Sequence, residues 1–382
     1  MAKLSATIAR LAAMRASHSP PTSFDGPNRL ADLDAFGTNP GALKAKIYVP
    51  EQIAEKPALV AVLHGCTQTA GGYDRGAGWS QLADEHGFIL LFPEQQRANN
   101  PNLCFNWFSP TDNGRDLGEA LSIRQMIMAM VHSHGVAPSR IFVTGLSAGG
   151  AMASVMLGSY PELFAGGAII AGLPYGLASN IPQALEAMRG CGAFEAEDLG
   201  DRVRRASDHN GPWPRISIWH GSADATVHSS NAEAILAQWR SVHGLEAAPN
   251  VSEQIAGHRR RSWNDAAGRP LIEDYRIANM GHGTPLSTTG QDACGMAMPH
   301  MLEAGISSTR RIASSWGLLK AGSERNFVQS DGEAHKGTPS VPVSKGSRLD
   351  ALPSELSRPI ISGNAGVEKV IHDALRAAGL IR

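Results

Sequence analysis

The sequence predicts an α/β fold in which helices cover both faces of a mostly parallel β-sheet. From about residue 36, short apolar runs of strand length alternate with stretches in which apolar residues recur at helical spacing. Chains with that alternation form parallel sheets covered on both faces. The 41 glycines and 23 prolines imply a body rich in turns, and the 42% of hydrophobic residues is the ordinary share for a globular chain.

The first three strands are expected within residues 43–92. Residues 43–49 and 57–63 are predicted to form adjacent strands, the second ending at His64-Gly65. Residues 87–92, "GFILLF", have the continuous apolar pattern of a buried strand and end at a proline.

In the middle of the chain, the pattern of apolar residues predicts a helix, a strand and a second helix. Residues 117–134 carry apolar side chains at helical spacing, 140–144 form a strand, and 148–159 form a helix of small residues that ends before Pro161.

The last predicted elements lie between residues 167 and 316. Residues 167–171 and 215–219 are expected to be strands, and 231–243 a helix. Residues 271–278 are expected to be the final strand, followed by a terminal helix that ends near residue 316.

The predicted domains are an N-terminal segment (1–35), a catalytic domain (36–321) and a flexible tail (322–382). Residues 323–365 are rich in Ser, Gly, Pro and charge, as in flexible segments. Residues 367–382 predict a short amphipathic helix that either packs on the body or binds a partner.

The charge balance and hydropathy exclude several classes of protein. The 34 Lys and Arg against 35 Asp and Glu leave a net charge of −1, so we expect no nucleic-acid partner and no anionic membrane partner. No apolar run approaches the roughly 20 residues that a membrane span needs. Residues 1–16 contain Lys3, Arg10 and Arg15, and show no ordinary secretory signal.

The strongest motif is Gly145-Leu146-Ser147-Ala148-Gly149, between a predicted strand and a predicted helix. A tight strand-to-helix turn of this kind exposes the serine at the edge of an α/β-hydrolase sheet, where it acts as a nucleophile. It also requires residues without bulk two positions before and after the serine. The alternative is a structural turn with a capping serine.

A serine nucleophile needs a base and an orienting carboxylate, which follow it in the order acid, then histidine, in α/β-hydrolases. Asp224 follows the strand "RISIWHG", and His282 lies between glycines after the strand "LIEDYRIA". His64 precedes the serine, His220 belongs to a strand, and His300 is expected to be helical. We therefore predict the triad Ser147, Asp224 and His282; a solvated loop carboxylate and a loop histidine are the alternatives.

The oxyanion of the intermediate needs two backbone donors. One is expected to be Ala148 N–H, directly after the nucleophile, and the other Cys66 N–H in the loop "HGCTQ" after an early strand. Cys66 could also be a buried thiol or a disulfide partner. His220, Asp224 and His228 form a rival metal cluster, but the strand and Gly221 argue against helical alignment of the three. We expect no metal and no cofactor.

Five segments together carry a resemblance: "LHGCTQTA", "CFNWF" at 104–108, "GLSAGGAM", "WHGSAD" and "MGHG". They resemble the esterase family of poly(3-hydroxybutyrate) depolymerases, which also includes feruloyl and acetylxylan esterases. The resemblance covers about residues 40–320. It implies an α/β-hydrolase fold, ester hydrolysis through an acyl-enzyme, and the site residues predicted above. Many family members are secreted, which implies an extracellular protein; the missing signal leaves a cytoplasmic enzyme as the alternative.

The resemblance also guides two further predictions. If the protein is exported, a disulfide between Cys66 and Cys104 is expected to hold the oxyanion loop, with Cys191–Cys294 as a second pair. Trp107 and Phe108 are candidates for an aromatic wall that binds a polyester chain, unless they are ordinary core residues.

The predicted function is thus hydrolysis of poly- or oligo(3-hydroxybutyrate) esters by a serine carboxylester hydrolase, with an ester as its only predicted ligand. A feruloyl or acetylxylan esterase is the alternative within the same class. A non-catalytic binding protein with an α/β-hydrolase-like fold is the alternative from another class.

Overall fold

A computed structural model of the chain describes residues 29–190, 195–290 and 293–320, all within one compact unit. The tail, its expected helix at 367–382, most of the N-terminal segment and Cys191 lie outside the described residues. No helix in the described part of the chain is long and apolar enough to cross a membrane.

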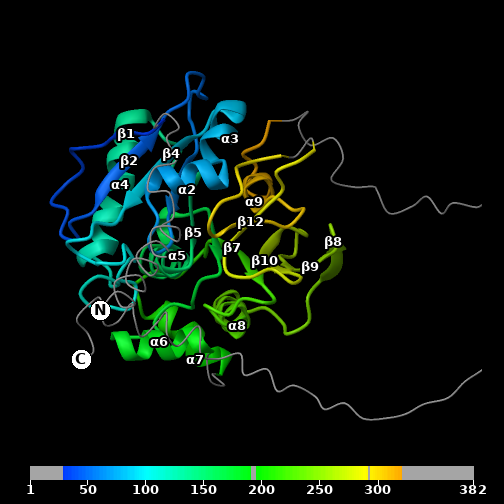
Figure 1. Cartoon of the computed structure of the whole chain (residues 1–382). Coiled ribbons are helices and arrows are strands. Elements are labelled where there is room, and N and C mark those ends of the chain that lie inside the picture. The colour runs from blue at the N-terminus through cyan, green and yellow to red at the C-terminus, as the bar shows by residue number, and fades with distance from the viewer. Residues whose placement is uncertain (1–28, 191–194, 291–292, 321–382) are drawn as a thin grey trace, which may run out of the picture. The chain divides into compact units, whose positions relative to one another are not determined.

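Ten of the described strands form one sheet whose six central strands are parallel (Figure 1). The pairs at both edges are antiparallel. In sheet order the strands are β1 (Ala31–Asp32), β2 (Lys44–Tyr48), β4 (Ile89–Glu94), β3 (Leu59–Leu63), β5 (Ile141–Leu146), β6 (Gly166–Ile170), β7 (Arg215–Gly221), β10 (Pro270–Ile277), β9 (His258–Asn264) and β8 (Val251–Ile255).

Helices follow β3, β4, β5, β6 and β7 in the described part of the chain, and those after β3 and β6 were not predicted from the sequence. The described helices are α2 (Ala70–Ala77), α3 (Trp79–His86), α4 (Gly118–His134), α5 (Ala148–Ser159), the 3₁₀ turn η1 (Pro161–Leu163), α6 (Ile181–Arg189), α7 (Ala196–Arg204), α8 (Ser230–His243) and α9 (Ser308–Ser315).

Alternate side chains of the central strands enter two separate cores, one on each face of the sheet. Along β3, Leu59, Ala61 and Leu63 belong to the core that α4, α5 and α8 cover. Val60 and Val62 belong to the core covered by α2, α3 and α9. The period of two in a strand therefore buries β3 on both faces, which confirms the predicted layers.

Two predictions about the strands are wrong. β2 and β3 are not neighbours, because β4 pairs with both and lies between them. β10 is not the final strand, since β11 (Thr284–Leu286) and β12 (Met301–Glu303) form a small parallel sheet after it.

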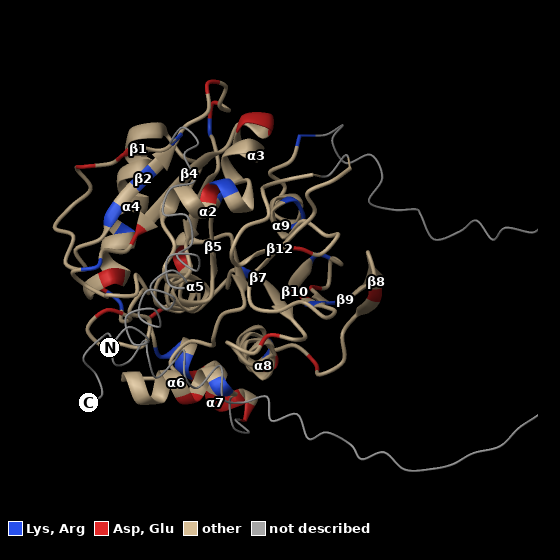
Figure 2. Ribbon diagram, in the orientation of Figure 1, with Lys and Arg blue, Asp and Glu red and all other residues tan. Residues whose placement is uncertain are grey.

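The antiparallel strands β8 and β9 lie beyond β10 and carry charge that the hydrophobic pattern does not reveal. Arg261 of β9 forms an ion pair with the buried Asp274 of β10 at 2.7 Å, and Arg260 pairs with Glu273 at 2.7 Å. Figure 2 shows basic and acidic residues mixed along these strands and along α7.

Candidate active site

Ser147 occupies a sharp turn between the end of β5 and the start of α5. Its backbone has φ 58° and ψ −119°, a conformation that L-residues rarely adopt and that costs about 1–3 kcal/mol. The turn is held because Ser147 N–H donates to Ile170 O of β6 at 2.9 Å. Ser147 therefore lies at the carboxyl edge of the sheet, directly before the first residue of α5.

The two glycines of the motif are required by close backbone approach. A Cβ atom on Gly145 would lie 2.3 Å from Gly149 O, and one on Gly149 would lie 2.3 Å from Leu63 O. Both distances are far below van der Waals contact. The turn is thus packed against itself and against the end of β3, which agrees with the spacing argued from the sequence.

Asp224 and His282 lie on two loops that follow the parallel strands β7 and β10, and their side chains are hydrogen-bonded. His282 Nδ1 lies 2.7 Å from Asp224 Oδ2. The two loops are also joined through their backbones, since Ala223 N–H donates to Met280 O at 3.0 Å. A Cβ atom on Gly221 would lie 2.3 Å from the same carbonyl oxygen.

The surroundings of Asp224 keep its carboxyl group ionised. Burial alone raises its pKa, but the neighbouring imidazole of His220 and the hydrogen bonds from His282 and Val227 N–H outweigh burial and hold the pKa of Asp224 below its usual range. A carboxylate only accepts, so His282 Nδ1 carries the proton. The other ring nitrogen, Nε2, is then free to accept a proton from a hydroxyl group, as a general base must.

Strand order explains how three positions far apart in the sequence reach one edge. β5, β6, β7 and β10 are consecutive, parallel neighbours, so the loops after β5, β7 and β10 all leave at the carboxyl edge, where ligands of open α/β sheets bind. Among the described residues, the Ser147 hydroxyl has no hydrogen-bond partner. The structure thus brings Asp224 and His282 into contact and places Ser147 on the same edge without a hydrogen bond to His282.

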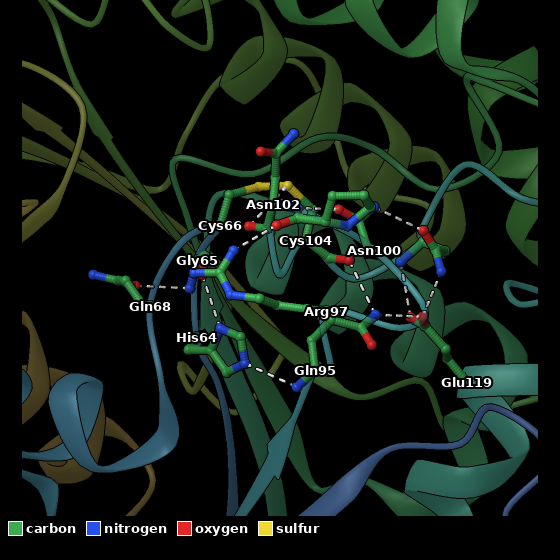
Figure 3. The surroundings of a disulfide bond; sticks show 12 residues. His64, Gly65, Cys66, Gln68, Gln95, Arg97, Asn100, Asn102, Cys104 and Glu119 are labelled. Carbon is green, nitrogen blue, oxygen red and sulfur yellow. Dashed lines mark hydrogen bonds between the residues drawn. A yellow bond between two sulfur atoms is a disulfide. The ribbon is translucent and has the colours of Figure 1, made fainter. Parts of the chain in front are cut away.

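In the loop after β3, Cys66 and the residues directly before and after it are each held by a covalent or hydrogen bond (Figure 3). Cys66 forms a disulfide with Cys104. Gly65 N–H donates to the Gln68 side chain at 2.8 Å, and Thr67 N–H donates to Asn102 O at 2.7 Å.

The backbone N–H of Cys66 donates to no described residue, and the same is true of Ala148 N–H at the start of α5. Two unused donors at the same sheet edge as Ser147 are what an oxyanion site requires.

The predicted Cys66–Cys104 disulfide is confirmed, and the predicted Cys191–Cys294 pair is wrong. Cys294 is a free, buried thiol. Its Sγ lies against two carbonyl oxygens of the turn between α2 and α3, Ala77 O at 3.7 Å and Gly78 O at 3.5 Å. The thiol thus packs inside the fold, and burial raises its pKa to about 12.

Trp107 and Phe108 pack edge to face with ring centroids 5.6 Å apart. Trp107 retains only 7% exposure and belongs to the core on the α4 side. Phe108 is partly exposed beside the same core, so it has more surface available for a ligand than Trp107.

Two histidines near the pair were not assigned a role in catalysis from the sequence. His220 is buried in β7, and its Nε2 donates to Val227 O at 2.8 Å and lies 3.4 Å from Asp224 Oδ2. His300 was predicted to be helical, and this is wrong. It lies in a turn with φ 63° after Pro299, and its ring centroid is 5.8 Å from that of His282.

The rival metal cluster is not assembled. His228 Nδ1 contacts the hydroxyl of Ser230 at 2.9 Å instead of joining His220 and Asp224. Within the described ranges, no three His, Cys, Asp or Glu side chains are placed to hold a metal ion.

Comparison with known proteins identifies the family. The family profile described as "Esterase PHB depolymerase" matches residues 43–263. The chain is 43% identical over 292 residues to poly(3-hydroxyalkanoate) depolymerase C of Paucimonas lemoignei, an alignment that covers 76% of this chain and 70% of the relative. This chain belongs to the PHB depolymerase family of esterases.

The family includes esterases that act on other substrates. Feruloyl esterase B of Talaromyces funiculosus is 30% identical over 268 residues, which cover 67% of this chain and 73% of that enzyme. The solved structure of an acetylxylan esterase from Aspergillus awamori superimposes with a TM-score of 0.65 and 25% identity, covering 76% of this chain and 99% of that one. The chain is therefore a carboxylic ester hydrolase with the α/β-hydrolase fold, as predicted.

Proposed function

We propose that Ser147, His282 and Asp224 form the catalytic triad of an esterase that cleaves 3-hydroxybutyrate esters. The observation that carries this proposal is the 2.7 Å contact between His282 Nδ1 and Asp224 Oδ2 at the sheet edge where the strained turn presents Ser147. Strain of this kind persists where the surrounding structure enforces it, and it gathers at catalytic residues.

The reaction passes through an acyl-enzyme. Ser147 Oγ attacks the ester carbonyl carbon while His282 Nε2 takes the hydroxyl proton, and the ionised Asp224 stabilises the imidazolium. The carbonyl oxygen becomes an oxyanion that accepts hydrogen bonds from Cys66 N–H and Ala148 N–H. His282 then protonates the leaving alkoxide. Water, deprotonated by His282, attacks the acyl-enzyme; His282 then returns that proton to Ser147 Oγ as the bond to the acyl group breaks and the acid leaves.

The proposed substrate class follows from the relatives. The identity of 43% to a poly(3-hydroxyalkanoate) depolymerase favours oligomers or chains of 3-hydroxybutyrate over the substrates of the more distant relatives. We assign the partly exposed Phe108, backed by the buried Trp107, to the wall that contacts the acyl chain.

An extracellular location is part of the same proposal. It is supported by the Cys66–Cys104 disulfide, because disulfides persist in oxidising compartments. Peptide mapping of native, non-reduced protein should recover the linked pair; free thiols at both positions would favour a cytoplasmic enzyme.

The test is a substrate panel measured with wild type and Ser147→Ala. We expect the wild type to hydrolyse hydroxybutyrate oligomers and short nitrophenyl esters, and the variant to be inactive on both. A strong preference for methyl ferulate would identify a feruloyl esterase, and a preference for acetylxylan an acetylxylan esterase. Absence of fluorophosphonate labelling at Ser147 in folded wild type would support a non-catalytic binding protein.

A further inference from the structure

Glu119 is a buried carboxyl group. Its hydrogen-bond partners are in turn bonded to the loop that contains Cys66, or to the segment that packs against that loop. Glu119 lies in the first turn of α4 and is 1% exposed. Its oxygens accept hydrogen bonds from Gln95 Nε2 at 2.6 Å, Asn106 N–H at 2.8 Å and Asn106 Nδ2 at 2.8 Å. No Lys or Arg of the described residues forms an ion pair with it. Burying such a group is costly unless its hydrogen bonds are satisfied.

The first connection from Glu119 runs through Gln95 and His64. Gln95 N–H donates to His64 Nε2 at 3.1 Å, and His64 Nδ1 donates to Gly65 O at 2.8 Å. Burial lowers the pKa of His64. The neutral ring can therefore accept at one nitrogen and donate at the other, as this chain of hydrogen bonds requires. The plane of the Gly65–Cys66 peptide, which carries the Cys66 N–H, is fixed through its carbonyl oxygen.

The second connection runs through the disulfide. Gln95 Nε2, already bonded to Glu119, also donates to Cys104 O at 3.0 Å. Cys104 is linked to Cys66 by the sulfur bridge. Glu119 and the Gln95 side chain thus hold the backbone on the far side of the disulfide, as Figure 3 shows.

The third connection fixes the segment between Asn100 and Asn106. Asn106, held by Glu119 through two donors, accepts at Oδ1 from Asn100 Nδ2 at 3.0 Å. The same segment supplies Asn102 O, which accepts from Thr67 N–H on the oxyanion loop. All three connections therefore begin at one carboxyl group and end on residues that flank the Cys66 N–H.

We propose that Glu119 and Gln95 are positioning residues that set the direction of the Cys66 N–H toward the oxyanion. The inference rests on the proposed function, since it assigns a purpose to the Cys66 donor. Neither side chain contacts the reacting atoms. An oxyanion donor is effective when it points to where the charge develops before the reaction begins, so a small displacement of this loop weakens transition-state binding more than substrate binding.

Two variants test the proposal. Glu119→Gln keeps the side-chain shape but replaces one oxygen by an NH₂ group, which cannot accept a hydrogen bond; in either orientation one N–H donor loses its acceptor, because donors approach both oxygens. Gln95→Met has a similar length and leaves the backbone donor to His64. It removes the links to Glu119 and Cys104 O, and also the acceptor of Gln96 N–H and Asn99 Nδ2. Glu197→Gln, an exposed carboxylate of α7 paired with Arg204, is the matched control.

Hydrolysis of p-nitrophenyl acetate and inhibition by a trifluoromethyl ketone, whose adduct carries an oxyanion, are the measurements. Removing a whole oxyanion donor costs about 10²–10³ in kcat, so a misdirected donor is expected to lower kcat by about tenfold or more. KM should stay within about twofold, and the inhibition constant should rise by the same factor as kcat/KM falls. The control should match wild type in all three values.

Several outcomes would overturn the inference while leaving the esterase assignment intact. These are an unchanged kcat in both folded variants despite lower melting temperatures, or a higher KM with unchanged kcat. If Glu119→Gln does not fold, Gln95→Met decides; if neither folds, the pair supports the fold as a whole and the inference is rejected. An inactive wild type would instead refute the proposed function.

Discussion

The Cys66–Cys104 bridge should contribute about 4 kcal/mol to the free energy of unfolding. The two cysteines are 38 residues apart in the sequence. In the chain-entropy treatment, closing a loop of that length removes about 13 cal/mol/K from the unfolded chain, or about 4 kcal/mol at 25 °C. Replacing both residues, Cys66→Ala with Cys104→Ala, returns that entropy to the unfolded state.

Equilibrium unfolding in urea, followed by tryptophan fluorescence, measures this difference. With a denaturant dependence of about 3 kcal/mol/M, the midpoint should fall by about 1.3 M. Wild type in dithiothreitol should show the same loss, whereas the double variant should not respond to the reductant. Cys294→Ala, which removes the buried free thiol, serves as a control whose response to dithiothreitol equals that of wild type. A loss below about 1 kcal/mol would refute the entropic argument.

Three further predictions concern catalysis, pH and substrate. Ser147→Ala and His282→Ala should each lower turnover by about 10⁶ with the double variant scarcely worse, because triad members act as a unit; nitrophenyl ester kinetics would contradict the assignment if one variant kept a tenth of the activity. Burial raises the pKa of Glu119 to about 8, against hydrogen bonds from Asn106 and Gln95 that lower it. The folded chain then binds an extra proton between about pH 4 and pH 8, so the free energy of unfolding should fall by a few kcal/mol as pH rises through that range. Urea unfolding at pH 5, 7 and 9 should show a smaller fall in the free energy of unfolding for Glu119→Gln. Trp107→Ala and Phe108→Ala should raise KM for hydroxybutyrate oligomers more than for a short nitrophenyl ester, since only the longer substrate loses remote contacts; equal effects on both substrates would make the rings structural.

The parts of the fold that could be predicted are those with regular apolar periodicity. The helix at 148–159 has the predicted bounds, because the Gly-x-Ser-x-Gly motif marks its start and Pro161 follows its end. Strand β9 was missed because "HRRRSWN" looks like an exposed stretch in the sequence. Two of its arginines, Arg260 and Arg261, form ion pairs with acidic residues of β10 and α8. Hydrophobic periodicity does not reveal such pairing.

In the candidate site, too, some residues could be predicted from the sequence and others could not. The order serine, acid, histidine and the strand before each residue were sufficient to choose Asp224 and His282. Glu119 could not be found in this way, because a buried carboxyl group in the first turn of a helix has the same sequence signature as an exposed one. The position of His300 was predicted wrongly. Its backbone has a positive φ and forms a turn after Pro299, whereas a helix was predicted there from the sequence.

The joined loops after β7 and β10 have a consequence for the order in which the molecule forms. The strained turn at Ser147 depends on β3 and β6, since Ser147 N–H donates to Ile170 O and Gly149 packs against Leu63 O. His282 reaches its place only when β10 pairs with β7, after α8 and the β8–β9 hairpin have been laid down between them. Contacts of that sequence separation form slowly. In a refolding chain, recovery of esterase activity therefore reports closure of the β7–β10 pair rather than collapse of the chain.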